Sequence, residues 1–146
     1  MTTKLTFVLL LSIASAVFYQ SAPISRGELT PQEKRGKAFY LRGESASGQE
    51  ITALMGEIDV PASTLTCAGC HGSDANGSPQ GPSLVSGKWL DTDGTFSGLR
   101  HTITDGVPQP KNPSPPMPPR GGAPLTDADV AAVAAYVWAI SHPNGK

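Results

Sequence analysis

The two cysteines of the chain are separated by two residues and followed directly by a histidine, in the segment Cys67-Ala68-Gly69-Cys70-His71. This C-x-x-C-H spacing is typical of covalent attachment of c-type haem, in which each thiol adds to one vinyl group of the porphyrin. The neighbouring imidazole can then reach the iron from the same side as an axial ligand. No other stretch of the sequence indicates chemistry of comparable specificity.

Three other uses of the motif are possible. A zinc site needs about four ligands, so Cys67, Cys70 and His71 would require a distant fourth. A thioredoxin-like redox pair is expected within a βαβ pattern, which the surrounding sequence lacks. A disulfide across two residues would close too small a loop to stabilise the fold much. Haem attachment is therefore the preferred interpretation.

The N-terminus has the pattern of a secretory signal, with Lys4, an apolar run over residues 5–18, and an Ala14-Ser15-Ala16 cleavage site. We predict a signal peptide over residues 1–16, or up to residue 22 if cleavage follows Ala22. The run is shorter than the roughly 20 apolar residues that a membrane-spanning helix needs. An uncleaved N-terminal membrane anchor is the alternative.

The rest of the chain is expected to form one domain over residues 26–143. The net charge is −1 and no block of like charges occurs, so neither nucleic acid nor an anionic membrane is an expected partner. With 16 glycines and 14 prolines, the composition favours few helices and long loops.

Two segments have strong helix-start signals. Thr30 can cap a helix that begins at Pro31, and Glu33 is placed to close a capping box; this helix should run to Arg42, with Gly43 ending it.

A second helix should begin after Thr126, where Asp127 and Asp129 lie favourably near the positive end of the helix dipole. Leu125 and Val130 have the spacing of a hydrophobic staple. One face of this helix is predicted to carry Val130, Val133, Ala134, Val137 and Ser141, and Pro143 should close it.

The periodicity between these helices is weaker. A short helix is predicted with Phe96, Leu99 and Ile103 on one face and Gly106 at its end. Residues 51–58 have some helical spacing but are interrupted by glycine. No segment shows a convincing strand alternation, so no sheet is expected. Residues 107–119 form a proline-rich loop. Such a composition is typical of a solvated linker, but the methionine within it, Met117, argues against that interpretation.

Four features resemble the class I c-type cytochromes, small all-α monohaem electron carriers, in their order and over nearly all of the mature chain. They are a helix with Gly36 and Tyr40, the motif at 67–71, Gly81-Pro82-Ser83-Leu84, and Met117 ahead of a final helix with Val133 and Tyr136. The resemblance implies a small all-α cytochrome c fold. In it the N- and C-terminal helices cross at Gly36, and loops wrap around one covalently attached haem. Tyr40 is the expected aromatic neighbour of Tyr136, with Phe39 competing for that place.

The resemblance also implies the cofactor-binding residues. One haem c would be attached through Cys67 and Cys70, with His71 as proximal ligand and Met117 as the second ligand of the iron. The carbonyl of Pro82 would accept the other imidazole N–H and fix the ring. Further apolar haem contacts are expected from Pro82, Leu84, Leu99 and Ile103. Trp89 and Arg100 could bind a propionate, although a packed tryptophan and a solvated arginine are equally good interpretations.

Competing ligands are Met55, His101 and His142. Met55 precedes the haem motif, on the wrong side by family order. His101 lies off the apolar face of its helix, and His142 sits where a cation suits the helix dipole. Met117 is preferred because prolines on both sides stiffen the loop that would carry this weak thioether donor.

One departure from the family pattern is plain. In compact members the first helix runs almost directly into C-x-x-C-H, whereas here residues 41–66 separate Tyr40 from Cys67. Residues 45–66 therefore look like an insertion, which could be a packing loop or an element that docks a partner.

The implied function is that of an exported, periplasmic carrier of single electrons between redox proteins, and not of an enzyme. We expect a monomer that docks transiently at the haem edge and is tethered to a membrane only if the signal is retained. One alternative is an electron-accepting subunit of a periplasmic dehydrogenase, docked through residues 45–66. Another is a five-coordinate haem protein that binds small gases or peroxide, which requires Met117 to be absent from the iron.

Overall fold

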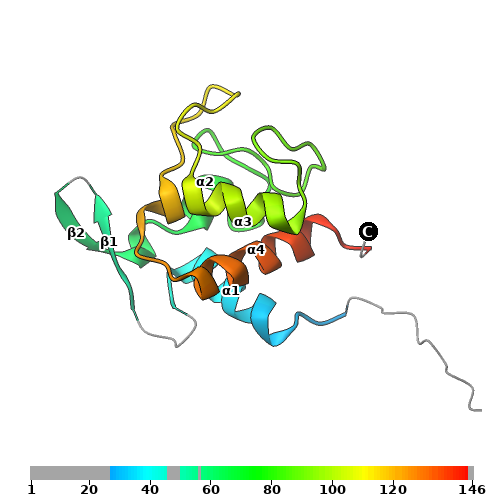
Figure 1. Ribbon diagram of the computed structural model, residues 1–146, viewed down its shortest axis with the longest axis horizontal. Coiled ribbons are helices and arrows are strands. Elements are labelled where there is room, and N and C mark those ends of the chain that lie inside the picture. Colours follow the sequence, from blue (N-terminus) through cyan, green and yellow to red (C-terminus); the bar gives the residue numbers. More distant parts are fainter. Residues whose placement is uncertain (1–26, 46–49, 56, 145–146) are drawn as a thin grey trace, which may run out of the picture.

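The computed structural model describes residues 27–45, 50–55 and 57–144, so the predicted signal peptide lies outside the described residues. The elements in chain order are α1 (Pro31–Arg42), β1 (Thr52–Met55), β2 (Ile58–Pro61), α2 (Cys67–His71), α3 (Phe96–Asp105) and α4 (Asp127–Ser141) (Figure 1). Two short 3₁₀ segments, η1 (Ala62–Thr64) and η2 (Pro119–Gly122), precede α2 and α4. Within the described ranges, no helix combines the length and apolarity needed to cross a membrane.

Both predicted helix starts are confirmed. Thr30 and Glu33 form a complete capping box at the start of α1, and Thr126 and Asp129 form one at the start of α4. Each box satisfies two backbone N–H groups that have no partner within the helix. At the other end of α1, Gly43 adopts the left-handed conformation with φ 68°.

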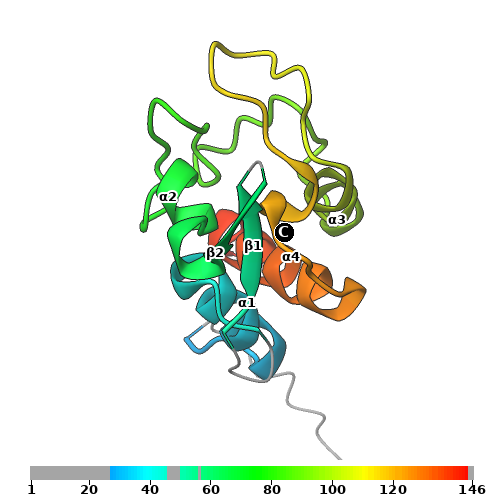
Figure 2. The ribbon, with the colours of Figure 1, turned by 90° about the vertical axis from the view of Figure 1, so that its left-hand side faces the viewer.

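Helices α1 and α4 cross in direct contact (Figures 1 and 2). A Cβ atom added to Gly36 would lie 1.9 Å from the carbonyl oxygen of Ala132 and 2.9 Å from Cβ of Tyr136. Beside this point the fully buried Tyr40 packs edge-on against Tyr136, with ring centroids 5.4 Å apart. The predicted crossing at Gly36 is confirmed, and Tyr40 is the aromatic neighbour of Tyr136.

The predicted short helix is also confirmed as α3, which packs on α4 and ends at Gly106. Leu99 and Ile103 are buried, as the periodicity predicts. Phe96, at the first position of α3, is 37% exposed and contributes little to the core.

The expectation that the chain has no strands is wrong for residues 52–61. Here β1 and β2 form an antiparallel hairpin that pairs Thr52 with Pro61 and Met55 with Ile58. The hairpin projects from the helices (Figures 1 and 2), and Ile58 near its tip is 68% exposed. Its base is held by buried Ala53 and Ala62. A ribbon that packs only at one end need not alternate apolar and polar residues, so the sequence carries no strand pattern.

We expect Gly36→Ala to lower the free energy of unfolding of the holoprotein by roughly 1–3 kcal/mol, because the methyl group forces two backbones apart. Denaturant unfolding measures the change. Arg35→Ala, at an exposed position of the same helix, should change stability by less than about 0.5 kcal/mol. Equal stability of the two variants would contradict the close helix crossing.

Candidate functional site

One large cavity brings the predicted site residues together. Its volume is about 640 Å³, within the range of roughly 300–1,000 Å³ that is usual for ligand and cofactor pockets. All six predicted cofactor-binding residues line it: Cys67, Cys70, His71, Pro82, Leu84 and Met117. The further contacts expected from Leu99 and Ile103 also lie in its wall, together with Val133 and Val137 of α4. The lining is mainly apolar, which suits the macrocycle of a haem.

Helix α2 presents the two cysteines to this cavity. Thr66 caps the helix by accepting a hydrogen bond from the backbone N–H of Gly69, at 3.2 Å. Cys67 and Cys70 are three residues apart on the helix and therefore lie on neighbouring positions of one face. Both are free thiols, with Cys67 half-buried and Cys70 exposed. The two sulfurs are thus available to one ligand in the cavity.

The donor set does not favour zinc. Burial raises the pKa of the Cys67 thiol to about 12, so the thiol is protonated at neutral pH when no metal is bound; a bound zinc ion would itself deprotonate it, and the number of ligands decides instead. Over residues 27–45, 50–55 and 57–144, no group of three or more His, Cys, Asp or Glu side chains could hold a metal ion. The described residues therefore do not assemble the set of about four ligands that a zinc site needs.

The imidazole of His71 is held in one orientation. Its Nδ1 lies 2.8 Å from the carbonyl oxygen of Pro82, as the resemblance implies. Because a carbonyl can only accept, Nδ1 carries the proton and Nε2 keeps its lone pair. Burial lowers the pKa of His71, against the opposing effect of this hydrogen bond. The ring is therefore neutral at neutral pH, the form in which imidazole binds metal.

Gly81 and Tyr40 complete the surroundings of His71. A Cβ atom at Gly81 would lie 3.1 Å from the ring of His71, so a side chain there would crowd the imidazole. The hydroxyl of Tyr40 donates to the carbonyl of Gly72 at 2.8 Å. Burial raises the pKa of Tyr40, which keeps the phenol protonated as the donor. This bond ties α1 to the residue that directly follows His71.

Met117 reaches the cavity from the loop after α3. Its backbone forms two hydrogen bonds with Val107, at 2.8 and 3.0 Å, and its half-buried side chain lines the cavity. Gly106 allows this pairing, because a Cβ atom there would lie 2.4 Å from the carbonyl oxygen of Met117. Figure 2 shows α2 on one side and the loop of residues 107–119, beside α3, on the other.

The competing histidines do not line the cavity. The side chain of His101 is 80% exposed, and its Nδ1 lies 3.0 Å from the Asp105 carboxylate. His142 stacks on Trp138 with ring centroids 5.0 Å apart. Met55 belongs to β1 in the projecting hairpin. These positions leave His71 and Met117 as the candidate ligands that share one cavity.

Of the two residues considered for a propionate, Trp89 lines the cavity, whereas Arg100 is exposed and does not. The structure also reveals a residue that no sequence pattern indicates. Lys111 donates from its backbone N–H to the Asp91 carboxylate at 3.3 Å and from Nζ to the carbonyl of Leu90. It therefore joins the loop of residues 107–119 to the other loop that lines the cavity.

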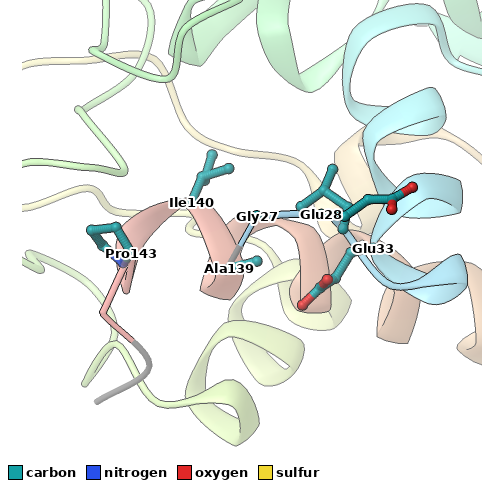
Figure 3. Close-up of a pocket in the computed structure, with 7 residues that line it drawn as sticks. Gly27, Glu28, Glu33, Ala139, Ile140 and Pro143 are labelled. Carbon is teal, nitrogen blue, oxygen red and sulfur yellow. The ribbon is translucent and has the colours of Figure 1, made fainter. Parts of the chain in front are cut away.

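A second, smaller cavity of about 290 Å³ lies between the residues before α1 and the end of α4 (Figure 3). Two carboxylates, of Glu28 and Glu33, lie at its edge, and both already have partners: Glu28 pairs with Lys34, and Glu33 closes the capping box at Thr30. It contains no cysteine, histidine or methionine. None of the predicted site residues is found there.

Comparison with known proteins agrees with this arrangement. The family model for cytochrome c matches residues 45–141. The cbb3-type cytochrome c oxidase subunit CcoP of Rubrivivax gelatinosus is 43% identical over 75 residues, which cover 51% of this chain and 22% of that subunit. The cbb3-type cytochrome c oxidase subunit FixP of Rhizobium etli is 35% identical over 81 residues, 53% of this chain and 28% of that subunit. The chain thus spans about a quarter of the length of these curated relatives. No solved structure matches.

We expect Gly106→Ala to loosen the pairing that holds Met117. Both Gly106 and Gly87 have φ 72°, but a Cβ atom at Gly87 meets nothing within 4 Å. Gly87→Ala therefore places a side chain at the same φ without the clash, which makes it the matched control. Amide hydrogen exchange of Met117 should accelerate roughly tenfold or more in Gly106→Ala alone. Equal acceleration in both variants would show that the close approach at Gly106 is unimportant.

Proposed function

The chain belongs to the cytochrome c family, and from this premise we propose that it holds one haem c and serves as a carrier of single electrons. Haem c would be attached through Cys67 and Cys70, which face one cavity from a single turn of helix. The supporting observation is that both cysteines and both candidate iron ligands line this one apolar cavity.

The proposed iron ligands are His71 and Met117. The hydrogen bond to Pro82 leaves Nε2 of His71 free to bind, and the pairing with Val107 fixes the backbone of Met117. Bound between these two side chains, haem iron would cycle between its ferric and ferrous states, at a higher potential than with two histidines. The protein would contribute rigid ligand positions and an apolar wall that excludes water.

We further propose an exported protein that meets its redox partners in the periplasm, as a monomer that docks transiently at the haem edge. The signal-like residues 1–16 support export. If the signal is retained, the same domain would be tethered to the membrane. A carrier must dissociate quickly, and small interfaces are usual in such encounters.

A second candidate function is that of a dedicated partner or subunit of a larger redox enzyme. The curated relatives are subunits of cbb3-type cytochrome c oxidases, so such an oxidase is a candidate for that enzyme. The projecting hairpin with its exposed Ile58 would be the docking element.

If the hairpin docks an oxidase, Ile58→Asp should lower kcat/KM for oxidation of the reduced protein by a cbb3-type oxidase roughly tenfold. Stopped-flow mixing of the two proteins measures the rate. Phe96→Asp, at another exposed apolar position, is the matched control and should have little effect. Similar rates for both variants would argue against docking through the hairpin.

Met117→Ala tests the carrier function. Loss of the thioether should leave the ferric iron high-spin and lower the reduction potential. Visible spectra and redox titration measure the two effects, and Met55→Ala serves as a control of the same residue type. If the spectrum is unchanged in Met117→Ala, Met117 is not a ligand and the proposal fails.

The alternative of a gas- or peroxide-binding haem is tested with carbon monoxide. With both axial positions filled by protein ligands, the reduced native protein should not bind carbon monoxide rapidly. Met117→Ala should bind it, since the position would then be open. Rapid binding by the native protein would favour the five-coordinate alternative.

A further inference from the structure

Arg120 has an unusual backbone conformation two residues after the proline that follows Met117. Its φ is 54° and its ψ 25°, in the left-handed region. Among the described residues, Ala75 is the one other non-glycine residue with positive φ. This conformation costs an L-residue free energy that glycine would avoid. An arginine here therefore suggests a role for its side chain.

The guanidinium of Arg120 is fastened to the start of α4. Nη1 donates to the carbonyl of Leu125, and Nη2 donates to the carboxylate of Asp127 at 2.7 Å. Leu125 is buried, and Asp127 is the first residue of α4. Two donors of one planar guanidinium thus hold η2 against the start of α4.

This attachment is transmitted to Met117 through a stiff connection. Only Pro118 and Pro119 separate Met117 from Arg120, and each proline ring fixes its own φ. The backbone N–H of Gly121 also donates back to the carbonyl of Pro118 at 3.0 Å. Besides α4, η2 also contacts β1, and both views show β1 and η2 side by side (Figures 1 and 2).

Arg120 does not itself line the cavity, although Met117 and Gly121 do. We propose that Arg120 is a positioning residue for Met117: by fastening η2 to Leu125 and Asp127, it holds the thioether at the iron. This inference rests on the proposed function, in which Met117 is an iron ligand.

Arg120→Gly is the decisive variant, because it relieves the left-handed backbone while removing the side chain. The measurement is the rate at which imidazole replaces the native ligand in the ferric holoprotein, which requires the methionine to leave first. We expect this rate to rise roughly tenfold, equivalent to about 1.4 kcal/mol. A rate equal to or below that of the native protein would overturn the proposal, because the arginine would then matter only through its backbone.

Two further variants separate the effect of the Arg120 contacts with α4 from the effect of losing any surface ion pair. Arg42→Leu removes another arginine–carboxylate pair, with Nε of Arg42 2.7 Å from Glu44, at the end of α1; it should change the rate less than twofold. Asp127→Asn keeps an acceptor but removes the charge, and should accelerate replacement by less than Arg120→Gly does. If Arg120→Gly does not fold, acceleration in Asp127→Asn beyond the Arg42→Leu control supports the proposal, and its absence overturns it.

The failure of the proposed function would be recognised separately. The native ferric protein should show the weak far-red charge-transfer band of iron bonded to methionine sulfur. If that band is absent, Met117 is not the ligand, and the proposed function falls together with this inference. If the band is present but Arg120→Gly does not change the rate at which imidazole replaces the native ligand, only the role of Arg120 is overturned.

Discussion

The fold depends on the direct contact of α1 and α4 at Gly36, where no side chain separates the two backbones. This crossing brings Tyr40 against Tyr136 and lets the Tyr40 hydroxyl reach the carbonyl of Gly72. It thereby fixes the end of α2 relative to both terminal helices. The same α4 supplies Val133 and Val137 to the cavity wall. A small residue at one position of α1 therefore sets the geometry of the site.

The two candidate iron ligands are held in different ways, each suited to its chemistry. His71 lies on a short capped helix and is oriented by a single hydrogen bond to Pro82. A thioether binds iron more weakly, and Met117 is accordingly held by backbone pairing with Val107 and by flanking prolines. Both arrangements place rigid backbone behind the ligand. Such rigidity is what an electron carrier requires, because little structural change should accompany each change of oxidation state.

The sequence predicts those parts of the molecule whose signals are local. The capping boxes at Thr30 and Thr126 depend on residues within one helical turn, and their helices begin as predicted. The hairpin of residues 52–61 is not predicted, because it packs only at its base and needs no alternation of apolar and polar residues along its strands. The contacts of Lys111 with Leu90 and Asp91 cannot be predicted either, because they join loops that are distant in sequence and no residue spacing indicates such contacts. The cavity itself can be placed only once such distant segments are brought together.

Ligation of the iron by His71 and Met117 is the feature on which electron transfer would depend. Near-infrared magnetic circular dichroism of the native ferric protein identifies the pair of axial ligands, because the charge-transfer band shifts with ligand type. We expect the position that is characteristic of histidine–methionine coordination. A bis-histidine position, or a high-spin spectrum with an open or water-bound site, would contradict it.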